Sequence, residues 1–303
     1  MKYSSSQATR QGGRELNEDR CVHSHTQEAC LFAVADGMGG HPEGEVAAQI
    51  AVDTFSNLFG KQARPSLSDP MQFLAAALLQ AHQQILRYAI QKKLKDSPRT
   101  TLVAALAQDG KAHWIHCGDS RLYFARGGHL VTRTRDHSYI EQKNAGIIHT
   151  TLTNRNILFS CLGSPTKPIF DQGDPVALRP GDRLLLCSDG LWDNLDDNTI
   201  VQELGGQALD KAVPKMVEMA LRAGGSRCDN VTVLAMEWMR QGSEPPTVAM
   251  PLSKAKGKSG SGAAVKHATG PVNISEANLD EAEIARSIAQ INQAIKRASA
   301  RKP

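Results

Sequence analysis

An apolar strand that ends in an acidic, glycine-rich turn constrains the fold of this 303-residue chain more than any other feature. The stretch is Leu31–His41, which reads L-F-A-V-A-D-G-M-G-G-H. A buried strand that ends in Asp36 directs a carboxylate out of the edge of a sheet, and the glycines that follow let the backbone turn sharply. If a hard cation binds there, the Gly37 carbonyl oxygen is a candidate ligand beside Asp36. For one D-G pair alone, a plain turn remains the simpler interpretation.

The same pattern of a strand followed by an acidic turn recurs along the chain. An apolar run before G-D-S-R carries Asp119, and L-L-L-C runs into S-D-G-L-W-D, which carries Asp189 and Asp193. Asp229 directly precedes the last apolar strand pattern. A further acidic pair lies near the start of the chain, in G-G-R-E-L-N-E-D-R. This segment contains Arg14, Glu18 and Asp19.

Tight turns between short apolar runs predict an antiparallel sheet. Residues 100–107 and 111–117 flank a D-G turn, and residues 122–126 and 129–133 flank a G-G turn. Their succession predicts an antiparallel meander and argues against a parallel dinucleotide-binding sheet. Apolar residues at helical spacing predict two long helices over 42–59 and 70–93, and a later one over 209–223.

Carboxylates gathered at strand ends repel one another in a cleft, so they require cations. The set comprises Glu18, Asp36, Asp119, Asp189, Asp193 and Asp229. No histidine or cysteine pattern accompanies them, and oxygen ligands alone select Mg²⁺ or Mn²⁺. Two such ions about 3.5–4 Å apart activate a water and clamp an in-line phosphoryl displacement. Arg14 offers a planar fork that suits the remaining phosphate oxygens.

Charge and composition exclude several functions. The formal net charge is +4, and residues 241–303 contain nine Lys/Arg and five Asp/Glu, so the first 240 residues are balanced and give no case for nucleic acid. No apolar run reaches the roughly 18–20 residues that span a bilayer, and the first residues do not resemble a signal peptide. The six cysteines form no C-x-x-C pair. They predict a reducing compartment, and we expect the chain to be cytoplasmic.

Five motifs in this order resemble the metal-dependent Ser/Thr protein phosphatases of type 2C, the PPM family, and in particular its compact bacterial members. They are G-G-R-E-L-N-E-D-R, A-D-G-M-G-G-H, G-D-S-R, S-D-G-L-W-D and D-N-V-T-V, and the similarity covers roughly residues 3–240. The resemblance implies an α+β fold, a four-layer α-β-β-α sandwich of two antiparallel sheets flanked by helix pairs. It also implies two Mn²⁺ or Mg²⁺ ions, or three.

The resemblance assigns a role to each acidic position. Asp36 would bridge two ions, with Glu18 and the Gly37 carbonyl on one of them, and with Asp189 and Asp229 on the other. Asp19 would hold a coordinated water, Arg14 would contact the phosphate, and a third ion would lie on Asp119, Asp189 and Asp193. Among these, the catalytic residues would be Arg14, Asp36 and Asp119.

Two departures from the family pattern concern the acid and the substrate. Animal members have a histidine directly after D-G, proposed as the general acid, but this chain has Met38 there. His41 lies three residues further on, and we do not transfer the acid role to it. Residues 146–155 are shorter than the usual bacterial flap, which shapes substrate access in the family, so substrate preference is left open.

The C-terminal part has no counterpart in the resemblance. We divide the chain into a phosphatase domain over 1–240, a flexible basic linker over 241–277 and an amphipathic helix over 278–303. Apolar residues at 4-3-4 spacing form one stripe of this helix. They are Ile284, Ile288, Ile291 and Ile295. A loosely attached terminal helix and a docking element for a partner or for the catalytic domain both fit this pattern.

The sequence therefore predicts a bacterial-type phosphatase that hydrolyses phospho-Ser/Thr in proteins with a metal-activated water. Its partners would be a phosphorylated protein, a Ser/Thr kinase that it opposes in signalling or secretion control, and a protein that docks on the C-terminal helix. Two alternatives are a metal-dependent phosphodiesterase or nuclease, which the uncharged domain disfavours, and a non-catalytic phosphoprotein-binding adaptor. The complete set of carboxylates disfavours the adaptor.

Overall fold

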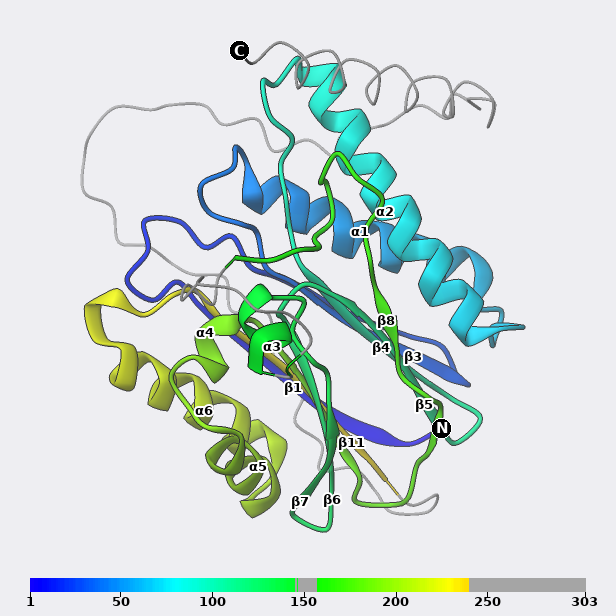
Figure 1. Cartoon of the computed structure of the whole chain (residues 1–303). Coiled ribbons are helices and arrows are strands. Elements are labelled where there is room, and N and C mark those ends of the chain that lie inside the picture. The colour runs from blue at the N-terminus through cyan, green and yellow to red at the C-terminus, as the bar shows by residue number, and fades with distance from the viewer. Residues whose placement is uncertain (145, 147–156, 240–303) are drawn as a thin grey trace, which may run out of the picture. The chain divides into compact units, whose positions relative to one another are not determined.

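Two antiparallel sheets pack face to face, and helices cover the outer face of each (Figure 1). This computed structural model describes residues 1–144, 146 and 157–239. The linker over 241–277, the helix over 278–303 and nearly all of the short flap lie outside the described residues. The predicted four-layer sandwich is confirmed.

The first sheet has the strand order β1-β11-β10-β6-β7. Its strands are β1 (Tyr3–Arg10), β11 (Val231–Trp238), β10 (Arg183–Cys187), β6 (Arg121–Arg126) and β7 (His129–Arg133). On its outer face lie α4 (Asp189–Trp192), α5 (Asp197–Gly206) and α6 (Leu209–Gly224), and the 3-10 turn Gly225–Arg227 follows α6.

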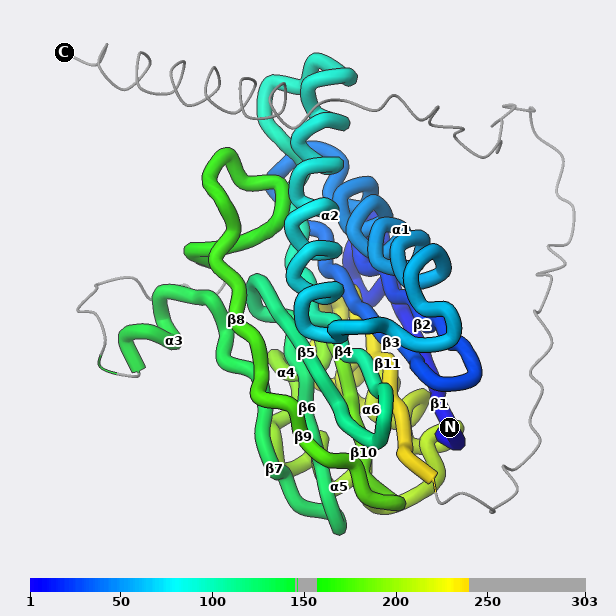
Figure 2. Tube along the Cα trace, turned by 90° about the vertical axis from the view of Figure 1, so that its right-hand side faces the viewer, coloured from blue at the N-terminus to red at the C-terminus, as the bar shows by residue number. Residues whose placement is uncertain are grey.

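The second sheet has the strand order β2-β3-β4-β5-β8, and β9 also pairs with β5. Its strands are β2 (Arg20–His25), β3 (Ala29–Ala35), β4 (Leu102–Gln108), β5 (Lys111–Cys117), β8 (Asp171–Gln172) and β9 (Val176–Ala177). The long helices α1 (Gly44–Gln62) and α2 (Pro70–Lys92) lie side by side on its outer face, as Figure 2 shows. A short helix, α3 (Tyr139–Asn144), has no buried residue and projects from the layers in Figure 2.

The position of strand β3 between two cores explains why its sequence is apolar without interruption. Alternate side chains of a strand point to opposite faces, and in a four-layer sandwich both faces are covered. Leu31 and Ala33 contact the core beneath α1 and α2, whereas Phe32 and Val34 contact the core between the two sheets. All seven residues of β3 are buried. A continuous apolar run is therefore what this position requires.

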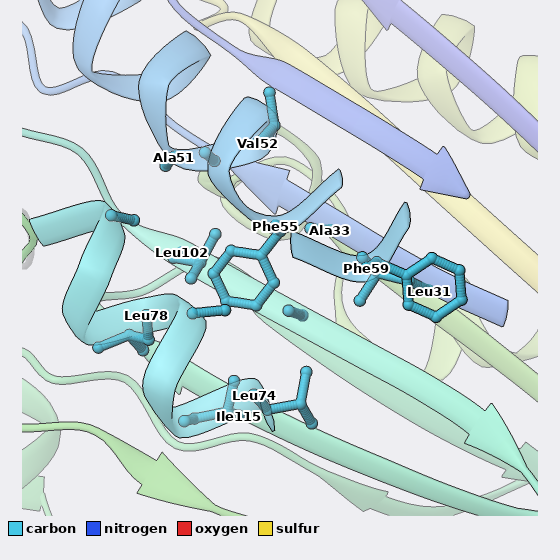
Figure 3. Close-up of a cluster of buried hydrophobic side chains, with 14 of the residues drawn as sticks. Leu31, Ala33, Ala51, Val52, Phe55, Phe59, Leu74, Leu78, Leu102 and Ile115 are labelled. Carbon is cyan, nitrogen blue, oxygen red and sulfur yellow. The ribbon is translucent and has the colours of Figure 1, made fainter. Parts of the chain in front are cut away.

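The core beneath the two long helices is the largest of the three. Figure 3 shows Phe55 of α1 and Leu78 of α2 between the helices and the strands that carry Ala33 and Leu102. Helix α2 begins with Pro70 in its first turn, and the side chain of Asp69 accepts a hydrogen bond from the Gln72 backbone N–H. Both predicted long helices are confirmed, with small shifts of their ends.

The expectation of a single meander is wrong, because β5 and β6 belong to different sheets. The hairpin β4–β5 lies in the second sheet and the hairpin β6–β7 in the first. The turn at residues 118–120 thus crosses from one sheet to the other. Tight turns identify strand pairs, but they do not reveal where the chain changes sheet.

Strands β1 and β2 were not predicted from the sequence. β1 reads Y-S-S-S-Q-A-T-R and has almost no apolar residues, because it is an edge strand with one neighbour, β11. Its pairing runs from Tyr3 opposite Trp238 to Arg10 opposite Val231.

No helix in the described part of the chain is long and apolar enough to cross a bilayer.

The cluster beneath α1 and α2 gives a first prediction. Phe55 is fully buried, so Phe55→Ala should lower the free energy of unfolding by about 3–5 kcal/mol, measured by urea unfolding. Asn57→Ala, on the exposed side of the same helix, should change it by less than about 0.5 kcal/mol. A loss below about 1 kcal/mol for Phe55→Ala would contradict the packing described here.

Candidate metal centre

The acidic residues gather at one end of the sandwich because several strands end or begin there. Asp36 follows β3, Asp119 lies in the turn that crosses from β5 to β6, and Asp189 directly follows Ser188 after β10. Asp229 precedes β11, which runs antiparallel to β10. The ends of both sheets therefore contribute carboxylates to one region.

The carboxylates lie close enough to perturb one another. Burial raises the pKa of Asp36 well above its usual range, and the charges of Asp19, Asp189, Asp119 and Asp229 raise it further. Burial likewise raises the pKa of Asp189, and the charges of Asp119, Asp229, Asp19 and Asp193 raise it further. Residues separated by up to about 200 positions in the sequence thus form one electrostatic group.

The backbone of Asp36 is fixed by the two residues that directly precede β4, Thr100 and Thr101. Its carbonyl oxygen accepts hydrogen bonds from the Thr101 N–H and from the Thr100 hydroxyl, both at 2.8 Å. The Asp36 N–H donates to Thr101 Oγ1 at 3.1 Å, and the Thr101 hydroxyl is 2.7 Å from that of Ser120. Asp36 and the turn that carries Asp119 are therefore held by one threonine.

Gly37 is required at its position for close packing. A Cβ atom there would lie 2.5 Å from the backbone of Gly44 and 2.9 Å from Cβ of Glu18. The Gly37 N–H also donates to the Glu18 carbonyl oxygen at 3.3 Å. Only glycine lets the turn after β3 approach the loop that carries Glu18 so closely.

Asn230 holds the loop that carries Arg14, Glu18 and Asp19. Its side-chain oxygen accepts from the Glu18 N–H at 2.7 Å, and its amide donates to the carbonyl oxygens of Gln11 and Leu16 at 2.7 and 2.9 Å. Its backbone N–H donates to Asp229 Oδ1 at 2.8 Å. One residue therefore joins the start of β11 to the first acidic loop, a role that the sequence analysis did not find.

Among the described residues, two buried carboxylate oxygens have no hydrogen-bond partner, namely Asp19 Oδ1 and Asp189 Oδ1. The second oxygen of Asp19 accepts from the Ser188 hydroxyl at 2.7 Å, and burial raises the pKa of Asp19 to about 6. Buried charges without partners are costly unless a cation compensates them. The atoms available as metal ligands are all oxygens, a set that fits Mg²⁺ or Mn²⁺ and not a soft metal.

Asp119 lies beside a separate network of aromatic and charged groups. The indole N–H of Trp192 donates to the Asp119 carbonyl oxygen at 3.0 Å, and the Arg121 guanidinium lies 3.7 Å from the Trp192 ring centroid. Arg121 also makes two hydrogen bonds to Asp136, at 2.8 and 2.7 Å. Burial, followed by the charge of Asp136, raises the pKa of Asp119 to about 7.

The remaining predicted residues lie at the rim of this group. The charge of Asp193, which is exposed, raises the pKa values of both Asp119 and Asp189. Burial raises the pKa of Glu18, and the charges of Glu45 and Asp229 add to the effect. The Arg14 guanidinium donates a hydrogen bond to the Asp229 carboxylate, and about half of its side chain is exposed.

The structure thus brings all nine predicted site residues to one end of the sandwich. Three supporting residues were missed, and each acts over a long sequence distance. They are Asn230, Ser188 and Trp192. The available signal was their position next to a predicted aspartate, since they directly adjoin Asp229, Asp189 and Asp193 respectively.

Comparison with known proteins identifies the family. Residues 7–226 match the family model described as protein phosphatase 2C, so the chain belongs to the protein phosphatase 2C family. The serine/threonine protein phosphatase PstP of Mycobacterium tuberculosis is 33% identical over 215 residues, which cover 69% of this chain and 40% of PstP. The chain therefore spans well under half the length of that relative. A serine/threonine phosphatase of Listeria monocytogenes is 30% identical over 233 residues, with 74% and 91% coverage.

Solved structures share the fold. PppA of Pseudomonas aeruginosa, described as a key regulatory component of T6SS, has a TM-score of 0.67 and 30% identity, over 78% of this chain and 97% of PppA. The catalytic domain of PstP in complex with two manganese ions has a TM-score of 0.67 and 31% identity, over 78% of this chain and 99% of that domain.

The raised pKa values predict how stability depends on pH without divalent ions. In the unfolded chain these carboxyl groups titrate near pH 4. In the folded chain Asp19 and Asp119 hold their protons up to about pH 6 and 7. Their contribution to stability is therefore complete below about pH 4 and is lost as the pH rises through 6–7.

We expect the Tm of the chelator-treated protein to fall between pH 5.5 and pH 8, and added Mn²⁺ to raise the Tm more at pH 8. Asp189→Asn removes one of the repelling charges, so it should flatten the fall, whereas Asp174→Asn, at an exposed position, should not. Differential scanning calorimetry checks this. An equal or higher Tm at pH 8 with chelator would contradict the prediction.

Proposed function

We propose that this chain is a metal-dependent phosphatase that hydrolyses phosphoserine and phosphothreonine in proteins. The observation that carries the proposal is the group of mutually repelling carboxylates around Asp36, with Arg14 at its rim. Membership of the protein phosphatase 2C family supports the same activity.

In this proposal the carboxylates hold two or three Mn²⁺ or Mg²⁺ ions. Glu18 and the Gly37 carbonyl would hold one ion, Asp189 and Asp229 would hold another, and Asp36 would serve both. Asp119 and Asp193 would hold an outer ion with Asp189. When bound, such ions activate a water for attack on phosphorus and neutralise the charge of the phosphoryl group.

The chain's own groups orient the substrate and the ligands. Arg14 presents a planar guanidinium that suits two phosphate oxygens, and its contact with Asp229 keeps it at the site before substrate arrives. The Ser188 hydroxyl orients Asp19 through its 2.7 Å hydrogen bond. Asp19 Oδ1, which is buried without a protein partner, is then free to accept a hydrogen bond from a water at the site.

The substrate class and the setting are part of the proposal. Relatives in Mycobacterium and Listeria are named serine/threonine phosphatases, which supports phosphoprotein substrates and an opposing Ser/Thr kinase. The description of PppA as a key regulatory component of T6SS supports a role in signalling or secretion control. Free cysteines throughout the described residues, five of them buried, fit a cytoplasmic chain.

The direct test is turnover of p-nitrophenyl phosphate and of a phosphothreonine peptide with Mn²⁺ and with chelator. Asp36→Asn should reduce Mn²⁺-dependent kcat by at least a thousandfold while the fold is retained, because it removes the carboxylate that would serve both ions. Asp174→Asn is the matched control and should retain activity. Activity of Asp36→Asn within tenfold of wild type would rule out the two-ion mechanism.

The same assay separates the alternative functions. A phosphodiesterase would hydrolyse bis-p-nitrophenyl phosphate faster than the monoester. A phosphoprotein-binding adaptor would bind the phosphopeptide without turnover.

We further propose that residues 278–303 dock on a partner through the stripe of isoleucines. A tether of roughly 35 residues lets an attached helix sample about 30–35 Å, which raises the local concentration of whatever the helix binds. Docking then affects the native substrate and leaves the chemistry of a small ester unchanged.

Ile288→Asp combined with Ile291→Asp should therefore reduce dephosphorylation of the native phosphoprotein and leave turnover of p-nitrophenyl phosphate unchanged. Deletion of 241–303 should have the same effect. Gln293→Asp, on the opposite side of a helical projection of 278–303, is the control. If deletion instead abolishes small-ester turnover or solubility, the segment packs on the catalytic domain and the docking hypothesis is wrong.

A further inference from the structure

One group of titratable side chains takes no part in the proposed metal centre. It consists of His116 near the end of β5, His137 in the segment after β7, and Asp171 of β8. One nitrogen or oxygen atom of each lies within 4.8 Å of the others. His116 and His137 are 4% and 3% exposed, and the Asp171 side chain is largely exposed. Two histidines and a carboxylate suit a transition metal, but they also suit a hydrogen-bonded chain.

The hydrogen bonds decide between these two possibilities. His116 Nε2 lies 2.7 Å from the Arg135 carbonyl oxygen, so it donates and leaves Nδ1 unprotonated. A metal-binding histidine shows this pattern. His137 shows the opposite pattern: its Nδ1 lies 3.2 Å from the Gly118 N–H and must accept. Burial lowers the pKa of His137, which favours the neutral ring. The neutral ring then carries its proton on Nε2, which is therefore not a metal ligand.

The Nε2 proton of His137 faces a carboxylate. Nε2 lies 3.4 Å from Asp171 Oδ2, an ion-pair distance, and it has no hydrogen-bond partner among the described residues. This contact favours the tautomer that leaves Nδ1 free to accept from Gly118. The charge of Asp171 thus acts on His137, and His137 in turn accepts the hydrogen bond from Gly118.

His137 binds both backbone groups of Gly118. Besides the bond to Nδ1, the His137 backbone N–H donates to the Gly118 carbonyl oxygen at 2.9 Å. On the other side, a Cβ atom on Gly118 would lie 2.7 Å from Thr101 Cβ, and Gly118 has a φ of +107°. A residue in this conformation has to be glycine. Gly118 is therefore confined between His137 and Thr101, which also bonds to Asp36.

The segment that carries His137 is itself firmly attached. Its neighbour Asp136 makes the two buried hydrogen bonds to Arg121, and the His137 carbonyl oxygen accepts from the Phe159 N–H at 2.9 Å. Gly118 directly precedes Asp119. A shift of His137 would therefore move the first residue of the turn that carries Asp119.

We propose that His137 is a positioning residue, which holds Gly118 and thereby fixes Asp119 relative to Asp36, with Asp171 selecting the tautomer that His137 needs. The proposal rests on the proposed function for its effect on turnover, because Asp119 is the residue assigned to the outer ion. The contacts of His137 with Gly118 and Asp171 do not depend on that function.

The first test uses the unmodified full-length protein. Labelled with ¹⁵N at histidine, His137 should show the tautomer protonated on Nε2 in the ring-nitrogen NMR spectrum at pH 7.5, and Asp171→Asn should increase the population of the other tautomer. A wild-type His137 protonated on Nδ1 overturns the proposal. So does one equivalent of Zn²⁺ that binds to His137 and is lost in His116→Asn, because the three residues are then a metal site.

The second test compares two substitutions that differ in one hydrogen bond. His137→Asn retains an acceptor for the Gly118 N–H, whereas His137→Leu has none. We expect His137→Leu to lower the affinity for the most weakly bound Mn²⁺ ion by about 10–100-fold in calorimetric titration. Loss of a supporting group near a metal typically has an effect of this size. The tighter ions should be retained, kcat should fall and KM should stay unchanged. His137→Asn should remain within about threefold of wild type.

Controls separate the possible failures. His113→Leu removes another buried histidine of β5 and should leave Mn²⁺ affinity unchanged. Equal losses of Mn²⁺ affinity in His137→Asn and His137→Leu would overturn the positioning role. If wild type binds Mn²⁺ but hydrolyses no phosphate monoester, the proposed function is wrong, and the Mn²⁺ affinities of the two variants still test the role of His137.

Discussion

The structure depends on holding several negative charges together at one end of a sandwich. Asp36 and Asp189 lie where burial and the charges of their neighbours disfavour ionisation. Such an arrangement persists only where the rest of the fold is stable enough to offset the electrostatic repulsion, or where a bound cation neutralises the charges. Three separate cores supply that stability, one between the sheets and one beneath each set of helices. The apolar cores thus provide the stability that the acidic end requires.

The two-sheet architecture explains why the charges meet at one end. Each sheet alone would carry acidic residues only at the ends of its own strands. The turn at residues 118–120 passes from one sheet to the other and so brings the two sets together. Thr101, directly before β4 of the second sheet, contacts Ser120 in that turn. Asn230, directly before β11 of the first sheet, contacts the loop that leads into β2. Links across the sandwich, rather than contacts within a sheet, thus set the relative positions of the carboxylates.

Local patterns predicted the parts of the fold that have local causes. The uninterrupted apolar run of β3 and the D-G after it were sufficient to identify a strand end with an outward carboxylate. The meander failed because a tight turn does not encode which sheet the next strand joins, and β1 was missed because its polar sequence gains its structure from β11 alone. The roles of Asn230 and Ser188 depend on partners more than 160 positions away. No periodicity within a short window can reveal such contacts.

The pairing of the first strand with the last has a consequence for how the protein forms. Tyr3 lies opposite Trp238, so the first sheet cannot be completed until almost the whole described chain has left the ribosome. Closing so long a loop costs entropy before its contacts stabilise it, and folds dominated by distant contacts form slowly. Asn230 and the Glu18 loop meet in the same closing step. The acidic end is therefore assembled in the same step in which β11 completes two of the cores, and the like charges gather only as those cores close.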